Sequence, residues 1–388
     1  MEFTARESFA HDEIPGIGVL VVNLGTPEAP TAGALRPYLR QFLSDPRVIE
    51  LPRWKWWPIL NLFVLTFRPK KSAHLYQTVW TDRGSPLALY TERQAAGLAE
   101  ILGREVGPPV HVRVGMSYGE PSVARALREL REAGCTRLLV LPMYPQYSGT
   151  TIGSVFDAVA SELTEWRVVP ELRTIHGWHD EPGYVAALVA SIREAWERPE
   201  SSGPTGEGGG EPEKLLFSFH GIPKRYFAGG DPYHCLCQKT ARLVAEELGL
   251  AEDRWVLAFQ SLFGREEWIK PYTADTVAAL GRAGVRSLDV VCPGFSADCL
   301  ETLEEINVQN RRFFTEAGGE RFRYIPALND RPDHLRFLAD LVKRHMTGWA
   351  APSGEWDEAA AREEAEAAKR RAEELKAKDL PADAGVSG

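Results

Sequence analysis

Short, continuous runs of apolar residues dominate the pattern of this chain. Such runs predict strands that are buried on both faces, as in parallel sheets. Between them, apolar positions recur every three or four residues, which predicts amphipathic helices. Strands that alternate with helices indicate an α/β fold with parallel sheets and right-handed crossovers. The predicted strands are 18–24, 110–116, 137–142, 214–219, 255–259 and 287–292, and the clearest predicted helices are 122–133, 235–248 and 273–283.

The strand–helix pattern occurs twice, over residues 16–170 and again over 213–330. Residues 200–213 are rich in Gly, Ser, Pro and Glu, which predicts a flexible connection between the two halves. The last part of the chain is rich in Ala, Glu, Lys and Arg, and predicts a polar helix with a disordered end. The predicted organisation is an N-terminal domain over 16–175, a connecting helix and linker over 176–212, a C-terminal domain over 213–346 and a charged tail over 347–388, helical over 355–379.

The longest apolar stretch runs from Trp56 to Phe67. It is about a dozen residues long, short of the roughly 20 needed to span a bilayer. Basic residues flank it, among them Lys55, Arg68 and Lys70. This pattern fits an ordinary core helix and also fits a helix that lies at a membrane surface, so both interpretations stay open.

Composition and charge exclude some classes of protein. Hydrophobic residues make up 44 % and charged residues 26 % of the 388 positions, as in ordinary soluble proteins. The net charge of −9 argues against a general nucleic-acid binder, so no nucleic-acid partner is predicted. Residues 1–16 lack the apolar segment of a secretory signal, and the odd number of cysteines, five, favours free thiols in a reducing cytoplasm.

Three residues suggest chemistry that moves protons or a cation. His220 comes at the carboxyl end of the predicted strand 214–219, where ligands bind in parallel sheets. Glu301 and Glu305 are four positions apart on a predicted helix and therefore share a face. Two repelling carboxylates opposite a neutral imidazole could accept protons or bind a metal ion. Taken alone, however, such a histidine is usually an ordinary interior residue, and such glutamates usually form a solvated face.

A set of motifs in fixed order resolves this ambiguity. These motifs are Asn23-Leu-Gly-Thr-Pro, Arg40-Gln-Phe-Leu-Ser-Asp-Pro-Arg-Val-Ile, Gly84-Ser-Pro-Leu, Tyr144-Pro-Gln-Tyr-Ser-Gly-Thr-Thr, Ser218-Phe-His-Gly-Ile-Pro, Gly230-Asp-Pro-Tyr, Phe259-Gln-Ser, Cys292-Pro-Gly-Phe and Glu301-Thr-Leu-Glu-Glu-Ile. The chain carries no dinucleotide-binding or phosphate-binding glycine motif. Through these motifs it resembles the ferrochelatases over roughly residues 16–345.

The resemblance implies two similar Rossmann-like (flavodoxin- or chelatase-like) domains, each a parallel sheet flanked by helices, with the active-site cleft between them. It implies a lyase that inserts ferrous iron into protoporphyrin IX to form protohaem and releases two protons. Iron is then a substrate, and no tightly bound cofactor is expected. Further expectations are a cytoplasmic location, peripheral membrane contact through an apolar lip near residues 54–67, and contact with the preceding porphyrin-producing oxidase.

The resemblance also assigns roles to residues. His220 corresponds to the histidine that binds the metal, accepts pyrrole protons or does both, and Glu301 to the carboxylate that faces it and shares the metal. Glu305 continues the acidic row, whose next member, Gln309, is an acid in some relatives. Cys299 stands where some relatives have a second histidine, and with Glu305 it belongs to the expected proton and metal path. The expected porphyrin-binding residues are Leu24, Arg40, Ser44, Tyr147, Ser148, Thr150 and Thr151.

No iron–sulfur cluster is predicted. Relatives with such a cluster have a cysteine where this chain has Gly149, or cysteines in a C-terminal extension, and the tail here has none.

Two alternatives to the proposed substrate and activity remain. The protein could act on coproporphyrin III or another tetrapyrrole; Leu24 favours protoporphyrin IX, because relatives with other substrates tend to have tyrosine there. A porphyrin carrier would not need both His220 and Glu301.

Overall fold

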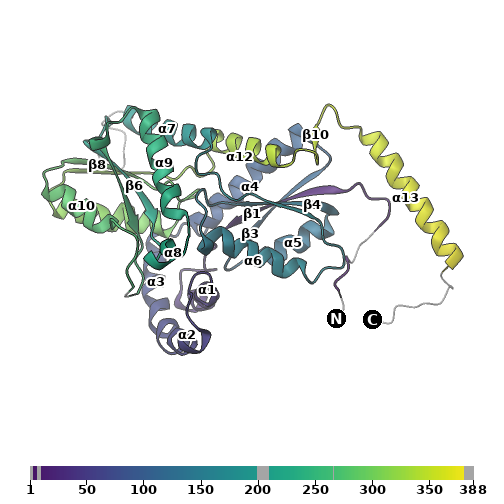
Figure 1. Ribbon diagram of the computed structural model, residues 1–388, viewed down its shortest axis with the longest axis horizontal. Coiled ribbons are helices and arrows are strands. Elements are labelled where there is room, and N and C mark those ends of the chain that lie inside the picture. Colours follow the sequence, from purple (N-terminus) through teal and green to yellow (C-terminus); the bar gives the residue numbers. More distant parts are fainter. Residues whose placement is uncertain (1–2, 7–9, 199–208, 265, 380–388) are drawn as a thin grey trace.

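The computed structural model describes residues 3–6, 10–198, 209–264 and 266–379. Within them, two four-stranded sheets with all neighbours parallel form the centre of the molecule, one in each half of the chain (Figure 1). The fold class predicted from the sequence is confirmed. The N-terminal sheet has the order β3 (Val110–Met116), β1 (Gly16–Asn23), β4 (Cys135–Pro142), β5 (Glu171–Thr174), and the C-terminal sheet has the order β7 (Trp255–Gln260), β6 (Lys214–His220), β8 (Ser287–Val291), β9 (Arg321–Ile325).

Helices cover both faces of each sheet. One continuous apolar core lies between the sheets, built from the inner faces of β1, β4 and β6 and from four helices that pack across the junction of the two halves. Other helices close the outer faces: α5 and α6 on the N-terminal sheet, α10 and α11 on the C-terminal sheet. The helices at the junction are α4 (Pro86–Glu105), α7 (Pro182–Glu197), α9 (Tyr233–Leu248) and α12 (Pro332–His345), and those on the outer faces are α5 (Val123–Glu132), α6 (Ser154–Leu163), α10 (Thr273–Arg282) and α11 (Arg311–Glu316).

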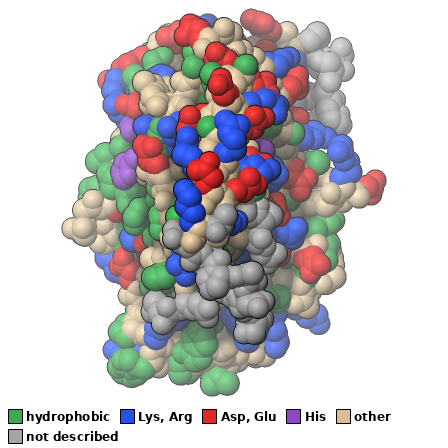
Figure 2. All heavy atoms as spheres, turned by 90° about the vertical axis from the view of Figure 1, so that its right-hand side faces the viewer, with side chains coloured by type: hydrophobic (Ala, Val, Ile, Leu, Met, Phe, Trp, Pro, Cys, Tyr) green, Lys and Arg blue, Asp and Glu red, His purple; other side chains and the backbone are tan. Residues whose placement is uncertain are grey.

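A helical arm extends from the N-terminal half at the bottom of Figure 1. It consists of α1 (Ala32–Ser44), α2 (Arg53–Ile59), the π-helix η1 (Leu60–Val64) and α3 (Leu65–Val79). Its inner side is buried, but several large apolar side chains point outward, with Trp54 75 % exposed and Phe67 69 % exposed. Figure 2 shows apolar side chains gathered at this end of the molecule. The core-helix interpretation of residues 56–67 is therefore correct for one face of the arm only.

The charged tail differs from its prediction at its beginning. Trp349 is buried in the main core, and the short strand β10 (Ala351–Pro352) pairs antiparallel with β2 (Val106–Gly107). The polar helix α13 (Glu358–Asp379) follows and stands away from the body (Figure 1), joined to it by an ion pair between Lys369 and Asp12 at 2.7 Å. Most of the predicted linker, 199–208, and the predicted disordered end, 380–388, lie outside the described residues. None of the described helices is both long and apolar enough to cross a membrane.

A buried histidine lies where the two halves meet. Gln94 of α4 donates from Nε2 to the carbonyl oxygens of Ser296 (2.8 Å) and Asn329 (2.9 Å). His334 of α12 approaches the same Asn329 carbonyl with Nδ1 at 2.9 Å, and since a carbonyl only accepts, Nδ1 carries the proton. The other nitrogen, Nε2, is buried and has no hydrogen-bond partner among the residues that the structure describes. Burial lowers the pKa of His334 to about 4, because a second proton would place an unpaired charge in the core.

We expect His334 to make the folded state sensitive to mild acid. Below its ordinary pKa of 6.5 and down to about 4, the unfolded chain binds a proton that the folded chain does not, so stability falls as the pH decreases. Between pH 7 and pH 5 this loss is about 2 kcal/mol. Urea unfolding of His334→Phe at the two pH values should show a drop smaller than that of the parent by this amount. The matched control His74→Phe, at an exposed position, should keep the parental drop, and an unchanged drop in His334→Phe would contradict the assignment.

Candidate functional site

His220 is the last residue of β6, at the carboxyl edge of the C-terminal sheet. Its Nδ1 lies 2.6 Å from the carbonyl oxygen of Gly221, so Nδ1 carries the proton of the neutral ring. In the neutral ring Nε2 then keeps its lone pair, which can accept a proton or bind a metal ion. The ring is half-buried, and its centroid lies 6.2 Å from that of Trp268.

The two glutamates lie on a π-helix, η4 (Glu301–Asn310), a form of helix often found at functional sites. Glu305 accepts hydrogen bonds from the backbone N–H of Ser261 (2.8 Å) and from its hydroxyl (2.5 Å). Burial raises the pKa of Glu305; the Ser261 bonds and the nearby His220 oppose this rise, and the charge of Glu301 adds to it. Glu305 thus interacts electrostatically with both other predicted catalytic residues, and the three predicted residues lie in one site.

Gln260 connects the sheet to this helix. It is the residue paired with His220 in the register of β6 and β7, and its Nε2 donates to the backbone carbonyl of Glu301 at 2.9 Å. Ser218 fixes the amide of Gln260 by donating to its Oε1 at 2.7 Å. The histidine and the first glutamate are therefore connected through one residue, whose backbone belongs to the strand paired with His220 and whose side chain bonds the backbone of Glu301.

A buried carboxylate holds the start of the helix. Asp298 accepts hydrogen bonds from Tyr324 (2.5 Å), Asn329 (2.7 Å) and Thr302 (3.0 Å), and burial nevertheless raises the pKa of Asp298. The next residue, Cys299, is buried beside Glu301, and desolvation followed by the charge of that glutamate raises the pKa of the thiol well above its usual value. Cys299 therefore presents a neutral thiol in this part of the site, and its place on the proton and metal path stays a prediction.

The arm contributes a cation that the sequence analysis treated only as a flanking charge. Arg68 of α3 lies over the ring of Phe263 at 4.5 Å and interacts electrostatically with Glu301 and Tyr76. Burial lowers the pKa of Arg68, while the charge of Glu301 opposes this. Its Nη1 atom is buried and has no hydrogen-bond partner within the described part of the chain. A buried guanidinium with an unused donor suits the carboxylate or other anionic group of a ligand.

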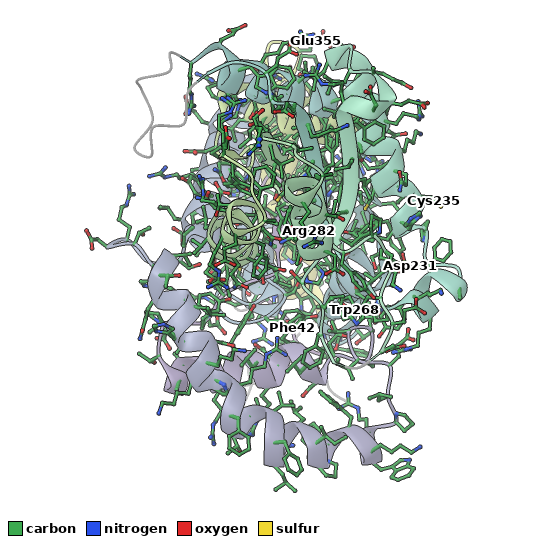
Figure 3. All side chains as sticks on the ribbon, turned by 90° about the vertical axis from the view of Figure 1, so that its left-hand side faces the viewer. Phe42, Asp231, Cys235, Trp268, Arg282 and Glu355 are labelled. Carbon is green, nitrogen blue, oxygen red and sulfur yellow. The ribbon has the colours of Figure 1, made fainter. Side chains whose placement is uncertain are left out.

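The segment after β4 carries four of the predicted porphyrin-binding residues, Tyr147, Ser148, Thr150 and Thr151. Ser148 is buried and its side chain caps the π-turn η2 (Gly149–Gly153), which carries the half-buried Thr150 and Thr151. Tyr147 stacks on His176 with ring centroids 4.1 Å apart. Figure 3 shows where the arm meets the body, near Phe42 and Trp268.

Two further predicted residues occupy the arm side of the site. Leu24, just after β1, packs against both the arm cluster and the cluster that contains Cys299. Ser44, at the end of α1, has a buried hydroxyl oxygen without a hydrogen-bond partner among the described residues. Both positions are consistent with a surface that a ligand would cover.

Two residues named in the sequence analysis lie apart from the others. Arg40 lies on the exposed side of α1, and in the described ranges no hydrogen bond or ion pair ties it to the other predicted residues, so its contact with a porphyrin stays a prediction. Gln309, the next position on the acidic face when residues are counted in fours, donates its amide to Glu304. The reason is the π-helix, in which residues five apart, such as 304 and 309, lie next to each other. Within the described residues, no three His, Cys, Asp or Glu side chains are grouped as a metal-binding cluster.

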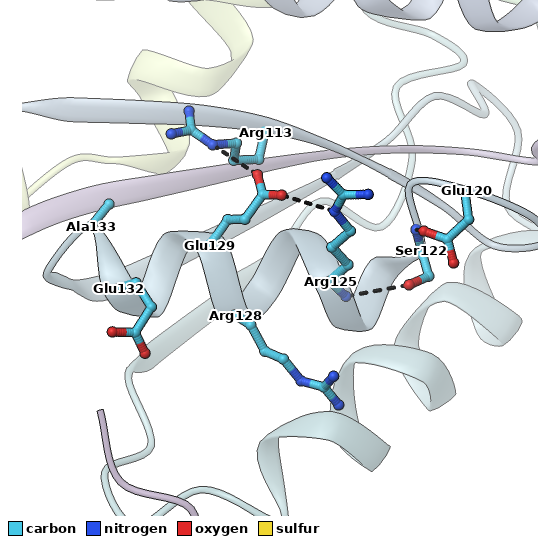
Figure 4. Close-up of a pocket in the computed structure, with 8 residues that line it drawn as sticks. All are labelled: Arg113, Glu120, Ser122, Arg125, Arg128, Glu129, Glu132 and Ala133. Atoms are coloured by element: carbon cyan, nitrogen blue, oxygen red, sulfur yellow. Dashed lines mark hydrogen bonds and ion pairs between the residues drawn. The ribbon is translucent and has the colours of Figure 1, made fainter. Parts of the chain in front are cut away.

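A separate depression lies elsewhere on the surface. It has a volume of about 810 Å³ and lies along α5 (Figure 4). Glu129 in its wall pairs with Arg113 (3.3 Å) and Arg125 (3.1 Å), so these charges are used within the protein. None of the predicted site residues lines this depression.

Two parallel-sheet halves with a histidine and an acidic π-helix at the carboxyl edge define an α/β protein with a chelatase-like fold. The solved structure described as "SirB from Bacillus subtilis with Fe3+" shares this fold at a TM-score of 0.51 and 10 % identity, over 88 % of this chain and 99 % of that one. The profile of the ferrochelatase family matches residues 16–346. Ferrochelatases of Thioalkalivibrio sulfidiphilus and Nitrosococcus oceani are each 52 % identical over 379 residues, covering 98 % and 97 % of this chain and 100 % of both relatives. The chain belongs to the ferrochelatase family.

Arg68 should contribute nothing to the stability of the free protein. Replacing it by Met removes a buried charge with an unpaired donor and keeps most of its volume, so we expect an unfolding free energy that is unchanged or higher by about 1 kcal/mol. Urea unfolding at pH 7 measures this. Lys70→Met, on the exposed side of the same helix, is the matched control and should change stability by less than about 0.5 kcal/mol. A loss of more than about 2 kcal/mol in Arg68→Met would identify a structural ion pair with Glu301 instead.

Proposed function

We propose that this protein inserts ferrous iron into protoporphyrin IX, forming protohaem and releasing the two pyrrole protons. Membership of the ferrochelatase family supports metal insertion into a porphyrin. The observation that carries the proposal is the arrangement of the neutral His220, with a free Nε2, within electrostatic range of Glu305, next to Glu301 on the same π-helix. These groups can accept two protons and offer nitrogen and oxygen ligands to an incoming ferrous ion.

The proton path follows from the environment of each group. In the free porphyrin, two of the four nitrogens carry hydrogen, and both protons must leave when the metal binds. Nε2 of His220 accepts a proton from the macrocycle. Glu305 is suited to take it onward, because burial raises its pKa and so increases its affinity for a proton. Glu301 then serves as the carboxylate that faces the metal.

Recognition of the macrocycle falls to two parts of the N-terminal half, the arm and the segment after β4. Leu24 and the inner face of the arm supply apolar surface for the ring, and Arg68 supplies a partly buried cation for a propionate. The loop with Ser148 and Thr150 forms the wall on the other side. A pocket that fits a bent macrocycle better than a flat one favours metal entry, since bending exposes the pyrrole nitrogens.

The substrate can be decided by a direct comparison. Protoporphyrin IX has two propionates and coproporphyrin III has four, and the apolar arm with one buried, unsatisfied arginine favours the less charged ring. Anaerobic insertion of ferrous iron into both porphyrins, side by side and followed by absorbance, tests this. Faster loss of protoporphyrin is expected. Preference for coproporphyrin would move the protein to that substrate, and binding without turnover of either would favour a carrier.

His220→Ala should abolish insertion while leaving porphyrin binding largely intact, because it removes the proton acceptor and metal ligand but no apolar contact surface of the arm.

Glu301→Gln should lower kcat by about 10²- to 10⁴-fold with little change in stability. Turnover is measured by absorbance and porphyrin affinity by fluorescence quenching. His111→Ala is the matched control, because His111 lies at the amino end of β3 whereas His220 lies at the carboxyl end of β6. It should keep parental turnover. Activity of His220→Ala within a few-fold of the parent would remove His220 from the mechanism.

We also propose that the exposed face of the arm rests on a membrane surface, where an apolar porphyrin could pass from the oxidase that makes it. Trp54, Phe63 and Phe67 expose large apolar area beside basic residues, the combination that binds anionic lipid surfaces.

Phe67→Glu should weaken binding to phosphatidylserine-rich vesicles about tenfold, as expected from the loss of one buried aromatic side chain. Vesicle co-sedimentation measures this. Leu375→Glu, at an equally apolar and exposed position of α13, is the control and should bind like the parent. Equal binding by both variants, or no binding by the parent, would contradict the membrane contact.

A further inference from the structure

Asp231 is one of the residues through which the C-terminal half holds the segment after β4 that carries Ser148 and Thr150; Gln146 of the same segment also donates to the Thr240 hydroxyl of α9 at 3.0 Å. Asp231 lies in the turn between α8 (Lys224–Ala228) and α9, on the body above the arm (Figure 3). Its Oδ2 accepts hydrogen bonds from the hydroxyl of Ser148 (2.9 Å) and from the backbone N–H of Gly149 (2.8 Å). Its Oδ1 accepts from the backbone N–H of Tyr233 at 3.0 Å. Both oxygens of the Asp231 carboxylate are thus fixed: Oδ1 by a donor of the C-terminal half and Oδ2 by two donors of the N-terminal half.

These bonds fix the direction of every proton in the loop. Ser148 has a single hydroxyl proton and gives it to Asp231, because a carboxylate only accepts. The oxygen of Ser148 must then accept from the Thr150 hydroxyl (2.9 Å) and from the Thr150 backbone N–H (3.2 Å). The hydroxyl proton of Thr150 is consequently used inside the loop, and its oxygen offers only lone pairs to a ligand.

The carboxylate of Asp231 also lies close to the backbone of Gly149. A Cβ atom added to Gly149 would lie 3.5 Å from Oδ2 of Asp231, in ordinary van der Waals contact. Other contacts between the halves are placed differently: Arg225 pairs with Glu50, and the Tyr226 hydroxyl donates to the carbonyl of Val48 at 3.0 Å. These reach the segment between α1 and α2, whereas Asp231 reaches the loop itself.

We propose that Asp231 is a positioning residue for metal insertion, which fixes the Ser148–Thr151 wall relative to the wall of His220 and Glu301. The proposal rests on the macrocycle lying between these walls, as proposed above. A pocket can bend a ring only if its opposite sides do not yield, and hydrogen bonds to a fixed carboxylate resist displacement better than apolar packing does. Asp231 contacts neither the ring nor the metal in this arrangement and acts through Ser148.

Asp231→Asn tests this with little change in shape. One amide oxygen cannot replace two carboxylate oxygens, so either Ser148 and Gly149 or Tyr233 then face an N–H group. We expect kcat to fall about 10- to 100-fold with an unchanged KM for ferrous iron. We also expect weaker out-of-plane bands in the resonance Raman spectrum of bound porphyrin, which report ring bending and which a loss of stability alone would not change.

Two further variants sharpen the test. Ser148→Ala should lower kcat in the same direction, and the double variant should be no slower than Asp231→Asn, since both changes break the same connection. Ser148→Ala also serves if Asp231→Asn does not fold. Asp180→Asn, a partly exposed carboxylate paired with Lys239, is the matched control and should keep parental kcat and Raman bands.

The outcomes separate this proposal from the proposed function. An active parent whose Asp231→Asn variant has parental kcat and parental Raman bands overturns the positioning role, even if the variant is less stable. A parent that inserts iron into neither porphyrin would instead overturn the proposed function, and the positioning role with it.

Discussion

The hydrogen bond from Gln260 to the backbone carbonyl of Glu301 is the constraint on which the site depends. Gln260 is the cross-strand partner of His220, so the sheet places the base, and the same residue places the first acid. A backbone contact is indifferent to the protonation state of the carboxylate. The distance between base and acid is therefore kept constant while protons pass between them, which an ion pair between the side chains could not provide.

Near this hydrogen bond lie groups that lower the folding stability of the protein without ligand. Ser261 has a left-handed backbone (φ 67°), unusual for a residue with a side chain, and it is held there by two bonds to Glu305. Arg68 and Glu305 are both desolvated, with opposite charges on different halves of the molecule. A ligand with its own carboxylates and displaceable protons complements both. The large core shared by the two sheets supplies the stability that these groups remove.

The sequence predicts the central strands because short, continuous apolar runs indicate strands that are buried on both faces of a sheet. It misses β5 and β9 because charged residues interrupt their short apolar patterns: β9 reads Arg-Phe-Arg-Tyr-Ile, and the buried Arg323 pairs with Asp289 and donates to the carbonyls of Ala195 and Gly210. His220 and the glutamates can be found because their motifs are local. Arg68 cannot, since its role arises only when the arm folds against the C-terminal half. Gln309 is misplaced by counting in fours along a helix whose turn is wider.

The division of the site between two halves explains why so many of its contacts run between domains. The groups proposed to exchange protons and metal lie on one half, where a sheet and a π-helix hold them. The groups proposed to grip the macrocycle lie on the other half and on its arm. To bend the ring, the two halves must keep their relative positions. A single carboxylate that accepts hydrogen bonds from both halves is suited to fix them. Apolar packing alone gives strength but little direction, whereas hydrogen bonds fix both distance and angle.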